Sequence, residues 1–421
     1  TLTNADLFEF TLTGAEAFVG VGATFDDNGT PLDYADDAID TAGALGLTAS
    51  VASFRLVTIK QLLVTYTAIQ IDDLGGDLVG IPGLTLGVSG VDVKVNQATL
   101  PAARLDWDAL TLSLGTLDAV GIDKSLQLYA EGDAAFSAFG FVAAVAHFTL
   151  VKAALPAGLT VDGIALGDAE GLRFSLTDAS VFVGLEAATV GAGDPGYAGD
   201  TTTGTLGLAA SVDSLKLHTI LAPSGTRYLG IEIVGLAGAL TGIDDVELAV
   251  DEVTVRVNRA TSAAGLATTP RLNWSSAALT PTGFGLAIAA ADELYAAGAA
   301  SVNLFDLVTG SADFELIKQD VDVDLGAETL TDAGLLLFGL SDLQLAVGIA
   351  GFGIDITGGT VALALLKPNA TAPGPARSWT ALQASGIGGT LHLPGVYAGV
   401  ENLVVEVNSA SVGATALDWA N

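Results

Sequence analysis

An acidic loop near the start of the chain contains the residue types best suited to chemistry. Between Phe25 and Asp40 a glycine-containing segment offers carboxylate and amide oxygens, at Asp26, Asp27, Asn28, Asp33, Asp36 and Asp37. Hard oxygen ligands on a flexible loop are what Ca²⁺ coordination requires. The segment lacks the spacing of an EF-hand and the nonapeptide of Ca²⁺-binding β-rolls. We therefore keep calcium as the one candidate cofactor, with a solvated, turn-rich surface loop as the alternative.

Other reactive residue types are scarce. The three histidines, His147, His218 and His392, do not occupy corresponding positions in the repeats of this chain, so they form no shared site. We predict structural roles for them. Cysteine is absent, which excludes disulfides, thiolate metal ligands and thiol catalysis. No G-x-S-x-G motif supports a serine nucleophile. The sequence therefore predicts no catalytic residues and no enzyme.

The chain is built from repeats of a length typical of whole domains. Phe10, Phe174 and Phe338 recur every 164 residues (174 − 10 and 338 − 174), and Gly20, Gly184 and Gly348 keep the same interval. Each copy closes with a tryptophan, at Trp107, Trp274 and Trp419. We predict a truncated copy over 1–109, a complete copy over 110–278 and a partial copy over 279–421.

The local pattern of each copy predicts strands. VDVKVN, VTVRVN and LVVEVN alternate apolar and polar residues, which should place Val93 and Val95, or Val253, Val255 and Val257, on one buried face. The asparagines that end these strings, Asn96, Asn258 and Asn408, are expected to satisfy backbone groups at a turn. Recurrent aromatics such as Tyr66, Tyr228 and Trp379 are expected in the core, with an exposed carbohydrate platform as the alternative.

A weaker recurrence inside each copy bears on the fold. The strings at 174–184, 208–218 and 240–250 each contain a small or Asp residue between two apolar runs, about 33 residues apart, as in stacked rungs. We predict an all-β fold, either an elongated β-solenoid or a continuous twisted β-sheet repeat array. Tandem β-sandwich domains are the alternative.

Charge and hydropathy limit the classes of partner that this chain can bind. The net charge of −33 repels phosphate backbones, so we expect no nucleic-acid binding. The segment 134–151 carries no formal charge and is long enough for a short membrane span. Its counterpart at 299–317 contains Asp306, Asp313 and Glu315, which do not belong in lipid. We predict that both segments are buried core strands, with a short helix as a variant, and that neither spans a membrane.

Several of these strings resemble a known group of repeats. The strings FTLVK at 148–152 and FELIK at 314–318, the loop at 18–37, RSWTALQA at 377–384 and the VxVNxA element resemble repeats of giant bacterial surface proteins of the LEPR-XLL type. This resemblance implies an extracellular or cell-surface location on a bacterium and a structural role. No catalytic motif comes with it.

Two functions follow as expectations. The first is an extracellular structural protein that associates with itself into a filament, a sheath or a surface layer. The second is an adhesin stalk or binding module, stiffened by calcium, that presents loops to cell-surface glycans. An apolar, strand-rich contact between copies would favour the first.

Overall fold

The computed structural model describes residues 4–30, 36–99, 102–110, 121–190, 201–266, 270–326, 328–349, 352–369 and 377–419. Within these residues the regular structure is strand, apart from the single 3₁₀ turn η1 (Thr280–Thr282). The prediction of an all-β fold is therefore confirmed. The chain forms two compact units.

Unit 1 contains one antiparallel sheet in which each long strand pairs with the long strand before it in the chain. Its long strands are β1 (Asp6–Val21), β4 (Leu45–Gln61), β5 (Val64–Val79), β6 (Leu84–Ala98), β7 (Leu126–Ala138), β8 (Val142–Ala154) and β11 (Glu170–Leu185). Its short ribbons pair β2 (Thr24–Asp26) with β3 (Ala38–Asp40), and β12 (Ala188–Val190) with β13 (Thr201–Thr203).

Unit 2 contains a second antiparallel run of strands. Its strands are β15 (Arg227–Thr241), β16 (Val246–Thr261), β17 (Asp292–Leu304), β18 (Val308–Asp324), β19 (Thr329–Ile349), β20 (Phe352–Thr357), β21 (Thr360–Lys367), β22 (Trp379–Leu393) and β23 (Val396–Ala410). The short β20 and β21 each lie between β19 and β22. Three further strands, β9 (Thr160–Val161), β10 (Ile164–Ala165) and β14 (Leu206–Leu221), contribute residues to both units.

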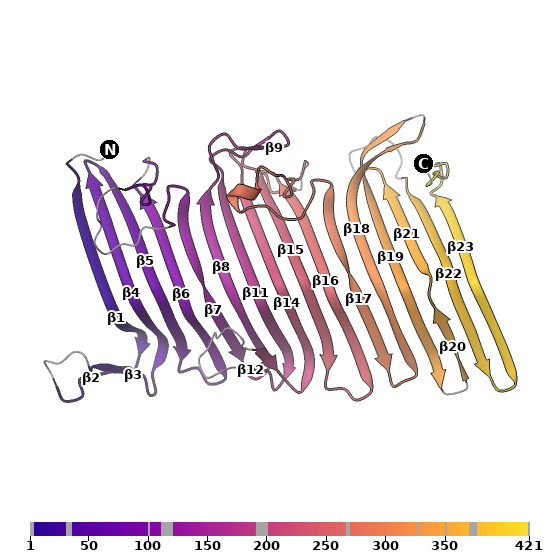
Figure 1. The fold of residues 1–421 in the computed structure, drawn as a ribbon, viewed down its shortest axis with the longest axis horizontal. Helices are drawn as coiled ribbons and strands as arrows, with labels where there is room; N and C mark the ends of the chain where they lie inside the picture. Colours follow the sequence, from indigo (N-terminus) through magenta and orange to yellow (C-terminus); the bar gives the residue numbers. More distant parts are fainter. Residues whose placement is uncertain are drawn as a thin grey trace. The chain divides into compact units, whose positions relative to one another are not determined.

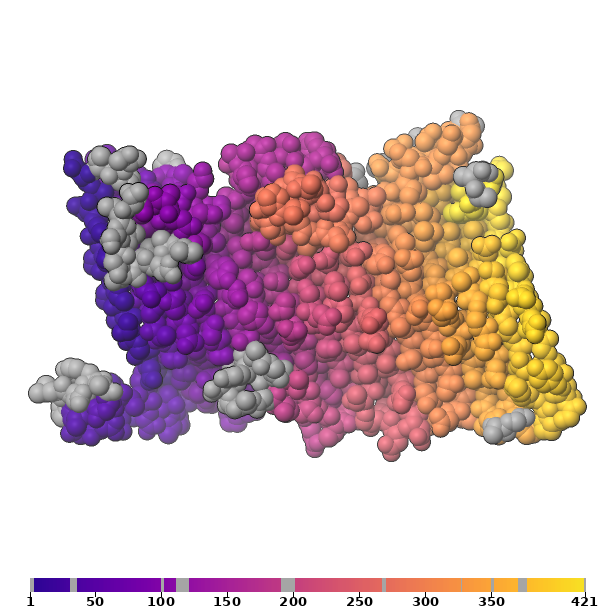
Figure 2. Space-filling model, viewed as in Figure 1, coloured from indigo at the N-terminus to yellow at the C-terminus, as the bar shows by residue number. Residues whose placement is uncertain are grey.

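The sheet of each unit is a meander. Because most long strands lie beside their predecessors, the colours within each unit change in the order of the sequence (Figures 1 and 2). Of the two predicted forms, the continuous sheet is the one found. Residues 134–151 lie in β7, β8 and the turn between them, so their assignment as strands is confirmed. No helix in the described parts of the chain is long and apolar enough to cross a membrane.

The structure contradicts the prediction of stacked rungs. The strings at 174–184 and 208–218 each lie inside one continuous strand, β11 and β14. Asp178 does not turn the chain but forms a β-bulge, with φ of 50°. A tight turn and a bulge both need a residue that tolerates positive φ, so Asp and Gly fit either one. Only the segment 240–250 contains a turn, between β15 and β16.

The best-buried side chains lie near one end of the strands, where connecting segments fold back over the sheet. In unit 1 the segment between β6 and β7 places Trp107 and Ile122 over Val57, Ile59 and neighbouring side chains. In unit 2 the segment between β16 and β17 buries Trp274, which is fully inaccessible to solvent. The predicted core position of the aromatics is confirmed for Trp107, Trp274, Tyr228 and Trp379.

The repeated asparagines hold these covering segments in place. Asn96 accepts a hydrogen bond from Trp107 Nε1 at 3.0 Å, and its amide donates to the carbonyls of Leu105 and Asp123, both at 2.8 Å. Asn258 binds Trp274 and two carbonyls in the same way. Both amides are fully buried, so the expectation that they satisfy backbone groups is confirmed.

Candidate functional site

One side of the sheet in unit 1 is apolar across all of its long strands. Directly paired residues of antiparallel strands point to the same side of a sheet, so a row can be followed from strand to strand. One such row, in the order β1, β4, β5, β6, β7, β8 and β11, is Leu12, Phe54, Ile71, Val93, Ala130, Leu150 and Phe174. We name this side the apolar face of unit 1 and the opposite side its polar face.

The apolar face continues past the middle of the strands. β7 alternates without a bulge between Leu128 and Ala138, which places Phe136 on the same side as Ala130. In β6 and β11 the alternation of side chains between the two sides shifts by one residue, at Gly90 and at Asp178, where φ is 58° and 50°. A second apolar row is Leu86, Phe136, Ala144 and Val181. The bulges thus keep the apolar residues of both strand halves on one side.

Unit 2 shows the same arrangement. The row from β15 to β23 is Ile233, Val255, Ala296, Leu316, Phe338, Leu363, Leu382 and Val407. A second row on the same side is Leu248, Val302, Gly310, Leu345, Ile356, Gly389 and Val400. We name this side the apolar face of unit 2.

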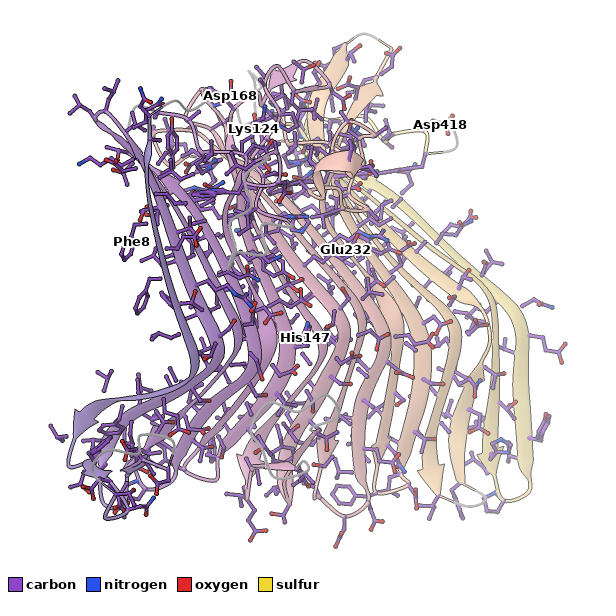
Figure 3. All side chains as sticks on the ribbon, turned by 60° about the vertical axis from the view of Figure 1, so that its left-hand side comes forward. Phe8, Lys124, His147, Asp168, Glu232 and Asp418 are labelled. Atoms are coloured by element: carbon purple, nitrogen blue, oxygen red, sulfur yellow. The ribbon has the colours of Figure 1, made fainter. Side chains whose placement is uncertain are left out.

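Both apolar faces are open to solvent. Phe10 is 41% exposed, Leu86 43% and Leu248 44%, and Figure 3 shows Phe8 projecting from β1. The sequence correctly places Val93 and Val95 on one face, but that face is only partly buried. Monomeric soluble proteins rarely expose contiguous apolar patches of more than a few hundred Å². These faces are therefore the strongest candidate sites on the molecule.

The polar face of unit 1 carries a compact charged cluster. Asp72 accepts hydrogen bonds from Ser53 Oγ at 2.6 Å, Gln70 Nε2 at 2.9 Å and Arg55 Nη1 at 2.5 Å. Burial alone raises the pKa of Asp72, but the hydrogen bonds from Ser53 and Gln70 and the charge of Arg55 outweigh it and hold this pKa below its ordinary value. The carboxylate therefore stabilises the fold as an anion.

The pH dependence of stability follows from this cluster. Because the pKa of Asp72 is lowered by folding, its contribution is complete above the ordinary carboxyl pKa of about 4 and is lost as the pH falls through the folded value. We expect Asp72→Asn to cost about 1–3 kcal/mol at pH 7 and to change stability little below about pH 3. Urea unfolding at the two pH values measures this. Asp73→Asn is the control, because Asn tolerates its φ of 54°. Equal losses at both pH values would contradict the assignment.

A second polar group lies on β7 and β8. His147 Nδ1 lies 2.9 Å from Asp133 Oδ1, and its Nε2 lies 3.5 Å from Glu131 Oε1. His147 itself is labelled in Figure 3. The hydroxyl of Tyr129 donates to Glu131. Burial, and then the bond and charge of Glu131, raise the pKa of Tyr129 to about 12. The raised pKa keeps the phenol protonated at neutral pH, so it donates its hydrogen bond to the carboxylate of Glu131.

The carboxylates of the acidic loop are used partly by the loop itself. Asp26 accepts from the backbone N–H of Asn28 at 3.0 Å, and Asp27 accepts from that of Gly29 at 3.0 Å. Thr30 Oγ1 donates to both carboxylate oxygens of Asp36 at 2.9 Å. Asp33 lies outside the described residues. In the described ranges, no group of three or more His, Asp or Glu side chains is close enough to hold a metal ion.

Calcium binding at this loop stays a prediction. Desolvation, and then the charges of Asp36, Asp27 and Asp26, raise the pKa of Asp37, and a bound divalent cation would offset the charge contribution. If the loop binds calcium, millimolar CaCl₂ should raise the melting temperature of the protein by a few degrees. The double variant Asp27→Asn/Asp36→Asn should lose this shift, and Asp40→Asn should keep it. Titration calorimetry supplies a second readout. An equal shift in all three proteins would rule out this loop.

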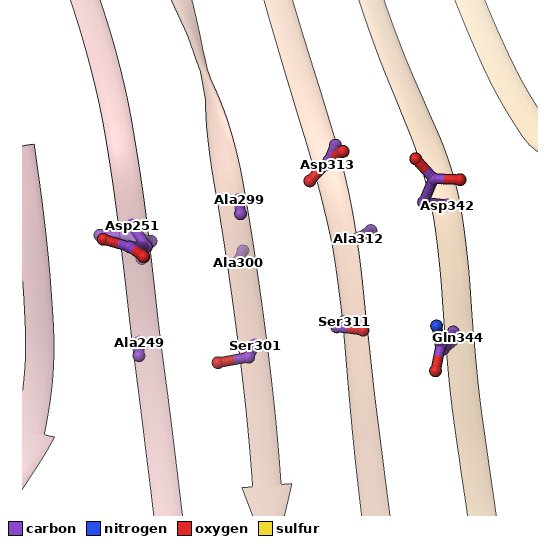
Figure 4. A pocket seen from close by; sticks show the side chains of 11 residues that line it. Ala249, Asp251, Ala299, Ala300, Ser301, Ser311, Ala312, Asp313, Asp342 and Gln344 are labelled. Carbon is purple, nitrogen blue, oxygen red and sulfur yellow. The ribbon is translucent and has the colours of Figure 1, made fainter. Parts of the chain in front are cut away.

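A shallow hollow lies on the polar side of unit 2 (Figure 4). Asp251, Asp313 and Asp342 line it, with alanines from β17 and β18 between them. Ser301, Ser311 and Gln344 add neutral polar groups. The side chains lack a histidine or a cation that would act as an acid or nucleophile partner. The hollow is a polar surface feature of the sheet.

No protein family, no curated protein and no solved structure was found to match this chain. The apolar faces are therefore interpreted from their own geometry. Sequence reasoning found the alternation that creates them and expected them to be covered. The signal for exposure was the length of the apolar pattern, which recurs in strand after strand without a second set of elements to cover it.

Proposed function

We propose that this chain is a structural repeat protein that associates with itself to build a filament, a sheath or a surface layer outside a bacterial cell. The observation that carries the proposal is the open apolar face of each unit. Burial of apolar surface is the main driving force for protein association, and a face of this extent is costly to leave in water. A partner that covers this face removes apolar surface from water and so stabilises the sheet.

Further features support a structural role over a catalytic one. The polar clusters described above use their charges for pairing within the sheet, as at Arg55 and Asp72. The recurring side chains of the copies, such as Asn96 and Asn258, hold covering segments in place. The extracellular location rests on the resemblance to bacterial surface repeats.

Electron microscopy of the native material, with and without a calcium chelator, tests the proposal. Regular filaments or sheets that survive chelation are the expected result. Particles that stay single at every protein concentration would overturn self-association.

An adhesin stalk or binding module is the second candidate, and the crowded carboxylates of the acidic loop favour it. Arrays that stiffen only with calcium, and that bind cell-surface glycans as single chains, would support it. In that case the loop, and not the sheet faces, would carry the function.

A further inference from the structure

We propose that the apolar face of each unit is covered by the apolar face of a second copy of this chain, so that two sheets stack face to face. This inference rests on the proposed self-association and names the surface that carries it. Stacked sheets pack about 10 Å apart through interdigitating side chains, which is the arrangement of β-sandwich cores.

The area of the face suits such a pair. Unit 1 sets seven strands of 13 to 17 residues side by side. At about 4.8 Å between strands and about 3.3 Å per residue, the face covers roughly 1,600 Å². A pair of copies would remove roughly twice that area from water, whereas a stable complex needs about 1,600 Å² in total. Even partial overlap of the two faces is enough for a stable dimer.

The distribution of charge favours a second copy. The rows of the apolar face contain no charged residue between Leu12 and Phe174 in unit 1, or between Ile233 and Val407 in unit 2. Charged residues enter this side in the rows towards the covered strand ends, where Lys152 lies 3.4 Å from Glu170, Lys318 lies 2.5 Å from Glu293, and Lys60 pairs with Asp6.

The acidic side chains of the sheets gather on the opposite, polar faces. Asp72 and Asp133 lie there in unit 1, paired with Arg55 and His147. Two chains that each carry a net charge of −33 would repel one another strongly through these faces. Contact through the apolar faces brings no carboxylates of these rows together. It also turns the acidic surfaces outward, where they keep the pair soluble.

The shape of the apolar face is better suited to packing against another sheet than to enclosing a small apolar ligand. Small-molecule sites are concave and enclose most of the ligand surface. Two hollows on unit 2 lie on the polar side, the one at Asp251 and Asp313 and another lined by Asp355 and His392. On the apolar face, small residues such as Ala130 and Ala144 stand directly opposite Leu150 and Phe136. Such alternation of small and large side chains lets two faces interdigitate.

The first test compares a pair of charges on the apolar faces with a pair on the polar faces. Leu86→Asp/Leu248→Asp places two charges on the apolar faces, at residues that are 43% and 44% exposed. Thr85→Asp/Gln344→Asp adds the same two charges on the polar faces, at exposed side chains. Sedimentation velocity should show dimers or larger species for the wild type and the control, and at least a tenfold weaker association for the apolar-face variant. Circular dichroism confirms that each variant retains its strands.

The second test needs no disruption of the face. Because the chain has no cysteine, Ala130→Cys on the apolar face and Ser137→Cys on the polar face of β7 each give one thiol. In the assembled protein, the thiol at position 130 should react with a maleimide at least tenfold more slowly than the thiol at position 137. On dilution to the single chain, the two rates should become similar.

The outcomes separate this inference from the proposed function. Assembly that persists in the Leu86→Asp/Leu248→Asp variant, with a reactive thiol at position 130, would overturn face-to-face stacking while leaving self-association through other surfaces intact. A wild-type protein that remains a single chain with both thiols reactive would overturn both. Protection of position 130 only after addition of neutral lipid vesicles would show that lipid, and not a second copy, covers the face.

Discussion

Asn258→Ala is expected to lower the free energy of unfolding by about 3–5 kcal/mol, one of the largest losses for any single side chain of this protein. The Asn258 side chain is fully buried and makes three hydrogen bonds, to Trp274 Nε1 at 3.1 Å and to the carbonyls of Leu272 and Ala289 at 2.9 Å. Alanine removes all three bonds, two of which, to Trp274 and to the carbonyl of Leu272, are buried. Equilibrium urea unfolding, followed by tryptophan fluorescence, measures the loss.

The chain offers a matched control at the equivalent position of the last copy. Asn408 is exposed and donates one hydrogen bond, to the carbonyl of Leu417 at 2.8 Å. Asn408→Ala should therefore cost no more than about 1 kcal/mol. Asn96→Ala should behave like Asn258→Ala, because it holds Trp107 in the same way. Equal, small losses at all three positions would refute the role of the buried amide.

Gly20→Val is expected to destabilise unit 1 by at least about 3 kcal/mol, which for many domains is a large share of the whole stability. Gly20 pairs directly with Gly46 across β1 and β4, and the Phe18 ring lies over both. A Cβ at Gly20 would lie 2.2 Å from the carbonyl oxygen of Leu45 and 2.6 Å from Phe18 Cζ. The backbone oxygen cannot move aside without breaking the pairing of the strands.

A substitution three residues away separates this clash from a general effect of valine. Ala17→Val lies in the same strand at an exposed position, and valine suits a strand, so its effect should stay within about 0.5 kcal/mol. Thermal unfolding of both variants gives the comparison. A Gly20→Val protein as stable as Ala17→Val would mean that the two strands are not held this close.

The sequence predicted several parts of this architecture because they depend on local chemistry. Alternation at period two marks strands wherever they end up, so VDVKVN and VTVRVN were recognisable as strands. The repeated Asn and Trp positions predicted a shared internal role, which the bonds of Asn96 and Asn258 confirm. The repeat spacing of Gly20 and Gly184 was also visible in the sequence, but its cause, the close approach of neighbouring strands, is a tertiary contact.

Other features depend on contacts between residues far apart in the chain. The sequence at Asp178 is equally consistent with a turn and with a bulge, because both need a positive φ. Only the pairing of β8 with β11 shows that it is a bulge. The acidic loop presents oxygen ligands in sequence, but where they converge is a matter of three-dimensional geometry, and Asp26, Asp27 and Asp36 accept hydrogen bonds from the loop itself.

The sequence by itself determined that this protein is a repeat of amphipathic strands with one apolar side. Period-two patterning fixes which residues share a side, since it follows from the pleat of a single strand. Only the tertiary structure decided that the strands form a meander in each unit, that Trp107 and Trp274 cover one end of the polar side, and that the apolar side stays open. The reason is physical: whether a face is covered depends on what packs against it, and no local pattern encodes that.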